Sequence, residues 1–209
     1  MSEFRLHCFA LSGNSYKVAL FLELAGLEWE SVFVDFLNGE TRNDKWRSDV
    51  NEQGEAPVLE HGSVKLSQSG VILDYLSELT GKFSAGTTDD RREILRWILF
   101  DNHKFTSYYA TLRFMYGLQK TGETPVTAFL RQRALAAYRI VDAHLEDRSF
   151  MVGDRLTVAD LSLAGYVFMP EETGIDHSAF PAIAAWKDRI KSMPGWRHPY
   201  DLMPGPTSM

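Results

Sequence analysis

The spacing of apolar residues predicts that the chain changes architecture near residue 80. Before that point, short runs with alternating apolar positions are typical of strands, and apolar residues at intervals of three and four indicate helices. Strands are predicted at residues 4–10, 29–36, 58–59 and 64–66, and helices at residues 17–25 and 68–79. The predicted order is therefore βαβ followed by ββα.

Beyond residue 80 the strand signals largely stop and helical spacing dominates. The stretch 81–90 is rich in Gly, Ser and Thr, which predicts a linker. We expect an α/β N-terminal domain at residues 1–80 and an all-α C-terminal domain at residues 91–209. Long helices are predicted at residues 94–115, 125–145 and 181–193, and the segment after them is expected to be irregular.

Individual residues predict three helix ends. Thr157 and Asp160 stand three apart before an apolar run, which is the pattern of a capping box. Gly26 follows the first predicted helix, where a left-handed residue is favoured. Ser15 is the expected N-cap of that first helix.

Composition and charge narrow the classes of function. The net charge of −6, without a basic run longer than two residues, argues against nucleic acid as a partner. No apolar run reaches the roughly 18 residues of a membrane span, and Glu3 and Arg5 stand where a signal peptide would be apolar. We therefore expect a cytoplasmic protein.

Cysteine and histidine usage limits the chemistry. Cys8 is the only cysteine, which excludes a dithiol mechanism, and the six His show no metal-ligand spacing.

The candidate chemistry lies between the first strand and the first helix. Ser12, Asn14 and Ser15 form a polar turn there, and free N–H groups at the start of a helix favour an anion. Neither common glycine-rich phosphate-binding pattern is present, so a thiolate becomes the stronger candidate. On the residues alone, an ordinary turn or N-cap serine is the favoured interpretation of Ser12, whereas a turn residue and a catalytic residue are equally good interpretations of Asn14.

Four motifs in this order resemble the cytosolic glutathione S-transferases. They are SGNSYKV, NEQGEAPVLEHG, LSQSGVILDYLSE and MVGDRLTVADLSLA, and the similarity runs from Phe4 to about Trp196. The resemblance implies a thioredoxin-like N-terminal domain that binds glutathione and an all-helical domain that forms the pocket for a second substrate. It also implies a homodimer that uses glutathione and a small hydrophobic electrophile.

The resemblance assigns two residues to the sulfur of glutathione. Ser12 falls where serine-type members place the hydroxyl that hydrogen-bonds this sulfur. Asn14 matches an asparagine that some bacterial and fungal members use for the same purpose.

Other residues match the positions that hold the rest of the tripeptide. Ala56 and Pro57 match the pair in which a cis-proline presents the preceding backbone to the cysteinyl part. Gln68 and Ser69 match the pair that grips the γ-glutamyl end. Lys45 is our candidate for the cation at the glycyl carboxylate, with Arg42 and Arg47 as open alternatives. The family also builds its hydrophobic pocket from the first long helix after the linker, which suggests Phe105, Tyr108 and Met115. Aromatic residues such as Phe105 and Tyr108 on this helix are also expected as core or subunit interface.

Two positions depart from the family pattern. Ala56 stands where many members have Val or Ile, which keeps the backbone contact and removes bulk. Glu55 stands where some members have a neutral polar residue, and its carboxylate could repel the tripeptide.

Three functions therefore compete. The first is a glutathione transferase, whose bound thiolate attacks an electrophilic carbon, a peroxide or a disulfide. The second is a non-catalytic glutathione- or ligand-binding protein of the same fold, which Glu55 and the uncertain cation favour. The third is a glutaredoxin-like reductase, although Ser12 and Ser15 stand where that fold would carry its two cysteines.

Overall fold

The computed structural model describes residues 3–169 and 172–205, and the chain divides into two compact units. The first unit combines Met1–Lys82 with Met193–Met209, and the second is Phe83–Ser192. None of the helices in the described part of the chain combines the length and apolar character needed to cross a membrane.

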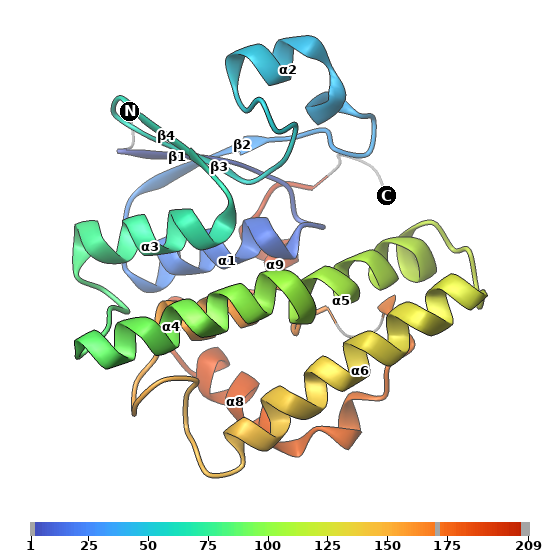
Figure 1. Ribbon diagram of the computed structural model, residues 1–209. Coiled ribbons are helices and arrows are strands. Elements are labelled where there is room, and N and C mark those ends of the chain that lie inside the picture. The colour runs from blue at the N-terminus through green and yellow to red at the C-terminus, as the bar shows by residue number, and fades with distance from the viewer. Residues whose placement is uncertain (1–2, 170–171, 206–209) are drawn as a thin grey trace. The chain divides into compact units, whose positions relative to one another are not determined.

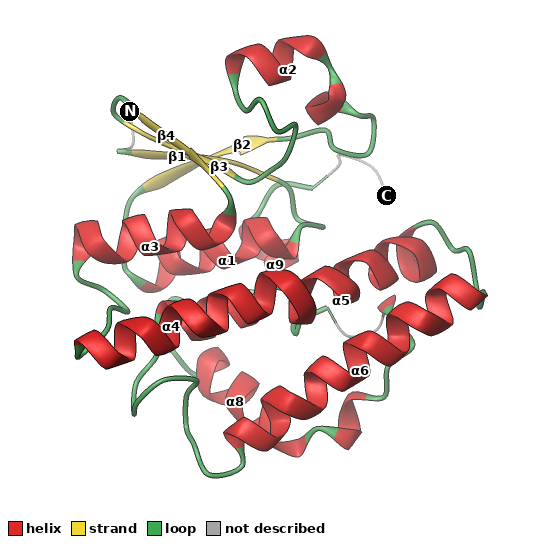
Figure 2. Ribbon diagram, viewed as in Figure 1, coloured by secondary structure: helices red, strands yellow, loops and turns green. Residues whose placement is uncertain are grey.

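The first unit is built on a four-stranded mixed sheet (Figure 2). Its strand order is β2-β1-β3-β4, with β1 parallel to β2 and antiparallel to β3. Helices α1 and α3 cover one face, and α2 lies on the other (Figure 1). This is the predicted βαβ-ββα arrangement. The bounds are β1 Phe4–Cys8, α1 Gly13–Leu24, β2 Trp29–Phe33, η1 Glu40–Arg42, α2 Asp44–Asp49, β3 Val58–His61, β4 Val64–Ser67 and α3 Ser69–Thr80.

The alternation within β1 explains the layering. Leu6 and Cys8 point to the face that α1 and α3 cover, and both are fully buried. His7 points to the opposite face, where its ring meets Trp46 of α2 edge-on at 5.8 Å between centroids. The strand is therefore covered on both sides.

Helix α1 begins earlier than its apolar spacing predicts. Ser12, and not Ser15, is the N-cap: its backbone is extended and its Oγ accepts a hydrogen bond from the Ser15 N–H at 3.1 Å. The expectation for Ser15 was wrong because Gly13 and Asn14 carry no apolar signal although they are helical. The predicted left-handed helix end at Gly26 is confirmed, with φ +69°.

The end of the chain belongs to the first unit, whereas the sequence pattern placed everything to residue 209 in the helical domain. Helix α9 (Pro199–Leu202) contacts α1. The Tyr16 hydroxyl donates to the Arg197 carbonyl at 2.9 Å, and the Ala10 N–H donates to the Pro204 carbonyl at 2.8 Å. These bonds join residues more than 180 positions apart, so no local sequence pattern predicts them.

The second unit is helical throughout its described part. The predicted long helix is one continuous helix in which two π-helical stretches interrupt the α-helical pattern, and its α4 segment starts with a capping box between Thr87 and Asp90. The linker is therefore shorter than predicted. The bounds are α4 Thr88–Phe100, η2 Asp101–Phe105, α5 Thr106–Arg113, η3 Phe114–Leu118, α6 Pro125–Leu145, α7 Val158–Leu163, η5 His177–Ala179 and α8 Pro181–Lys191.

A buried carboxylate organises the start of α7. Asp160 accepts hydrogen bonds from the backbone N–H groups of Met151 and Thr157, from the Thr157 hydroxyl, and from the Trp186 indole at 2.9 Å. Burial raises the pKa of Asp160 to about 6, while these donors oppose the shift. The predicted capping box is confirmed, and it also ties α7 to α8.

We predict that Asp160→Asn lowers the free energy of unfolding by about 2–3 kcal/mol, because the new NH₂ group would face donors and leave them unpaired. Urea denaturation measures the difference. Asp154→Asn is the matched control at an exposed position and should change little. A loss below about 0.5 kcal/mol for Asp160→Asn would contradict this account of the network.

Candidate functional site

The strand register brings the predicted motifs of the first unit to one end of the sheet. His7 near the end of β1 pairs with Val58 at the start of β3, and Val58 pairs with Ser67 at the end of β4. The polar turn after β1, the segment before β3 and the segment after β4 therefore leave the sheet at the same edge. These segments contain Ser12 and Asn14, Ala56 and Pro57, and Gln68 and Ser69, respectively.

Ser12 combines a structural hydrogen bond with an available proton. Its Oγ accepts from the Ser15 N–H, and this bond fixes the hydroxyl at the start of α1. A hydroxyl also has one hydrogen to donate, and the O–H of Ser12 has no acceptor among the described residues. Ser12 is 6% exposed, so a ligand atom there would be largely shielded from water.

Two other groups lie close to Ser12 in the chain. Asn14 occupies the first turn of α1, is half-buried, and has no side-chain hydrogen bond within the described part of the chain. Cys8 is fully buried, and burial raises the pKa of its thiol to about 12. The protein's own thiol is therefore protonated and inaccessible at neutral pH.

The segment before β3 is held by a buried asparagine. Asn51 donates from Nδ2 to the Glu55 carbonyl at 3.0 Å and accepts from the Gln53 N–H at 3.1 Å. The peptide bond between Ala56 and Pro57 is cis, with Pro57 buried and Ala56 half-buried. Asn51 was not predicted to be a site residue, and the one sequence signal for it is its place at the start of the turn-forming NEQG cluster.

The side chains of Gln53, Glu55 and Gln68 form a hydrogen-bonded cluster at the start of α3. Gln68 Nε2 donates to Gln53 Oε1 at 3.1 Å and to Glu55 Oε2 at 2.6 Å. The next residue, Ser69, is buried at the first position of α3, and its hydroxyl has no hydrogen-bond partner among the residues described. Gln53 was not predicted to be part of the site.

The three basic candidates for the glycyl carboxylate differ in their partners. Lys45 is highly exposed and forms an ion pair with Asp49 within α2, which raises the pKa of Lys45. Arg47 donates to the Glu52 carbonyl at 3.2 Å. Neither Arg47 nor Arg42 forms an ion pair with a described residue. Lys45 would have to leave Asp49 to bind a ligand.

The residues suggested for a hydrophobic pocket have different environments in the second unit. Phe105 is buried and stacks on Tyr138 at 4.7 Å between ring centroids, so it belongs to the packed interior. Tyr108 is half-buried beneath the Arg133 guanidinium, which lies 5.4 Å from the ring centroid. Met115 is half-buried in η3.

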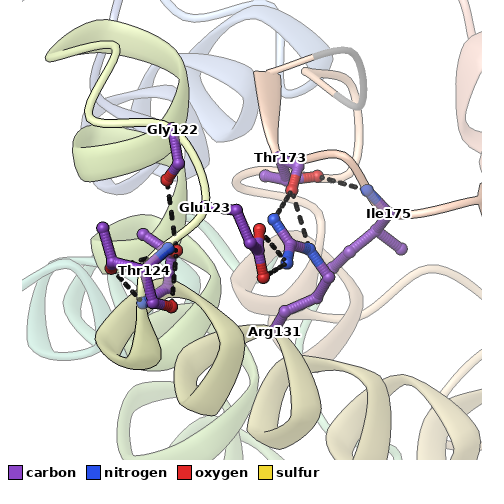
Figure 3. Close-up of polar contacts among 7 residues, drawn as sticks. Gly122, Glu123, Thr124, Arg131, Thr173 and Ile175 are labelled. Atoms are coloured by element: carbon purple, nitrogen blue, oxygen red, sulfur yellow. Dashed lines mark hydrogen bonds and ion pairs between the residues drawn. The ribbon is translucent and has the colours of Figure 1, made fainter.

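A polar network fixes the surroundings of η3. Figure 3 shows Arg131 between Glu123, which precedes α6, and the loop that carries Thr173. The Nη1 atom of Arg131 lies 2.7 Å from both carboxylate oxygens of Glu123, and the Arg131 guanidinium donates to the Thr173 carbonyl. The guanidinium also lies 5.0 Å from the ring centroid of Tyr116 in η3. We assign this cluster a structural role within the helical unit.

Comparison with known proteins identifies the family. A model of the glutathione S-transferase N-terminal domain matches residues 4–78, and one of the C-terminal domain matches residues 107–194. The glutathione S-transferase F14 of Arabidopsis thaliana is 30% identical over 97% of this chain and 87% of its own length. The chain belongs to the glutathione S-transferase family.

Other members of the family support the assignment. The disulfide-bond oxidoreductase YfcG of Escherichia coli K12 is 27% identical, and the match covers 89% of each chain. The crystal structure of a glutathione S-transferase from Pseudomonas fluorescens Pf-5 superposes with a TM-score of 0.90 at 29% identity, covering 96% of this chain and 100% of that one. The predicted thioredoxin-like and helical architecture of this family is thereby confirmed. Within the described residues, no group of three or more His, Cys, Asp or Glu side chains could hold a metal ion.

We predict that Ser12→Ala lowers the free energy of unfolding by about 1 kcal/mol, because Ala cannot accept the Ser15 N–H. Ser12→Gly should cost only a few tenths of a kcal/mol, since Gly is itself a good N-cap, and Ser12→Thr should keep the bond. Urea or thermal unfolding of the three variants checks this order. Equal stability of Ser12→Ala and Ser12→Thr would show that the cap contributes nothing.

Proposed function

We propose that this member of the family binds glutathione as the thiolate and transfers it to a small hydrophobic electrophile. The observation that carries the proposal is the hydroxyl of Ser12. It is held at the start of α1 by the Ser15 N–H, and its own proton has no acceptor among the described residues. Ser12 would donate this proton to the glutathione sulfur as a hydrogen bond and would not itself attack the substrate.

The available energies are sufficient for this role. A free thiol has a pKa near 8.5, so lowering it by about two units requires roughly 2.7 kcal/mol in favour of the anion. A hydrogen bond to a charged group contributes about 1.5–3 kcal/mol, and the positive end of a helix adds about 0.3–1 kcal/mol. A neighbouring general base is therefore unnecessary.

The remaining site residues have the following proposed roles. The backbone of Ala56, before cis-Pro57, would pair with the cysteinyl part, and Gln68 and Ser69 would hold the γ-glutamyl end. Lys45, once released from Asp49, is the proposed cation for the glycyl carboxylate, and Arg42 and Arg47 are its alternatives. Tyr108 and Met115 are retained for the electrophile pocket. The homodimer stays a prediction from the resemblance, and the cytoplasmic location stays a prediction from the sequence.

A second candidate reaction is the reduction of disulfides by glutathione. The relative YfcG is named a disulfide-bond oxidoreductase, which supports this reaction for a chain of the same family. The bound thiolate would attack one sulfur of the disulfide and expel the other as a thiolate. Cys8 is unsuited to replace glutathione, because its thiol is buried and its pKa is raised to about 12.

We predict that the ultraviolet thiolate band of bound glutathione titrates about two pH units below that of the free tripeptide. Ser12→Gly should return the titration towards pH 8.5, because the donor is lost while the helix cap is largely kept. Ser12→Thr is the matched control and should retain the lowered value. If Ser12→Gly left the titration unchanged while Asn14→Ala raised it, the proton donor would be Asn14.

We predict turnover of at least one of three glutathione-dependent test substrates: a chloronitroarene, an organic hydroperoxide and hydroxyethyl disulfide. Cys8→Ala should leave the rate unchanged, and loss of disulfide reduction in that variant would support a mechanism through the protein's own thiol. Glutathione binding without turnover of any of the three would instead support a non-catalytic binding protein.

A further inference from the structure

The amide of Gln68 is held in one orientation. Its Nε2 lies 2.6 Å from a carboxylate oxygen of Glu55, and a carboxylate accepts hydrogen bonds and donates none. The nitrogen, and not the oxygen, must therefore face Glu55. The second hydrogen of the same nitrogen points to Gln53 Oε1 at 3.1 Å. Both N–H groups are thus used, and the carbonyl oxygen Oε1 is the polar atom that Gln68 retains for a ligand.

Gln53 is itself oriented by its neighbours. Its Oε1 accepts from the Ser67 hydroxyl at 3.2 Å as well as from Gln68. Its backbone N–H donates to Asn51, which also holds the Glu55 carbonyl. The acceptor end of Gln68 is therefore set by a chain of bonds from the buried Asn51. The backbone of Gln68 has φ 67°, which an L residue rarely adopts, so its position is constrained as well.

The cluster offers complementary charges to a zwitterion. The side-chain oxygen of Gln68 and the Glu55 carboxylate are acceptors, and they favour an ammonium group. The first turn of α3, which begins at the next residue, has no side-chain cap, and the hydroxyl of the buried residue Ser69 has no hydrogen-bond partner among the described residues. These groups favour a carboxylate. The arrangement fits a free α-amino-acid end, and the γ-glutamyl end of glutathione has that chemistry.

We propose that Glu55 is a positioning residue that makes the site selective for a ligand with a free α-ammonium group. It acts by fixing the Gln68 amide so that its oxygen accepts from that ammonium, and by adding its own negative charge beside it. The inference rests on the proposed glutathione function. It also reverses the expectation that Glu55 repels the tripeptide, because the nearest charge on the ligand is positive.

The test compares two ligands by calorimetry: glutathione, and glutathione acetylated at its α-amino group, which keeps the thiol and both carboxylates. The wild-type protein should bind glutathione at least about tenfold more tightly, since a charge-assisted hydrogen bond is lost with the ammonium. Glu55→Gln should reduce this preference to near unity by weakening glutathione alone, because a glutamine can also donate and the Gln68 amide can then turn over.

Two further variants make the result specific. Glu52→Gln removes the same charge from a neighbouring exposed position and should keep the preference. The exchange variant Glu55→Gln with Gln68→Glu returns an acceptor to position 68 and should restore it.

Several results would overturn the proposal while leaving the proposed function standing. They are glutathione binding without preference in the wild-type protein, an unchanged preference in Glu55→Gln, or an equal loss of both ligands in that variant. Absence of glutathione binding in the wild-type protein would instead overturn the proposed function itself.

Discussion

The hydrogen bond from the Ser15 N–H to the Ser12 hydroxyl is the interaction on which the candidate chemistry depends. It caps the start of helix α1 and fixes the rotamer of the Ser12 side chain. The bond uses a lone pair of the Ser12 Oγ and leaves the hydroxyl hydrogen available to donate. A group that caps a helix in this way can still donate to an anion placed at the same helix end. The structural and chemical interpretations of Ser12 are therefore compatible, and the cap is what presents the proton.

The sheet register gives this cap its neighbours. Because β3 runs antiparallel to both β1 and β4, the ends of β1 and β4 and the start of β3 meet at one edge. In the proposed site, the groups for the sulfur, the backbone and the two charged ends of a tripeptide would come from segments far apart in the chain. The cis peptide before Pro57 and the bonds around Asn51 shape the middle of that edge.

The carboxylates of Asp160 and Glu55 have different environments, which suit the first to a structural role and the second to the proposed role in ligand recognition. Asp160 is fully buried and surrounded by donors, so its charge is used entirely in joining α7 to its neighbours. Glu55 is exposed and contacts an amide whose other end remains open to a ligand. The first carboxylate stabilises the fold, and the second can act on what binds. Cys8 is also fully buried, and in the proposed function the reactive sulfur is that of the ligand.

Local patterns in the sequence were enough to predict the order of elements, the left-handed end at Gly26 and the capping box at Asp160, because each depends on residues within a few positions of one another. The motifs also indicated the family.

Local patterns failed where distant residues decide the outcome. The C-terminal segment joins the first unit through contacts between distant residues, such as the hydrogen bond from Tyr16 to Arg197. The orientation of the Gln68 amide likewise depends on Gln53 and Glu55. Sequence spacing reports which residues share an element, but only tertiary packing brings separate elements into hydrogen-bond distance.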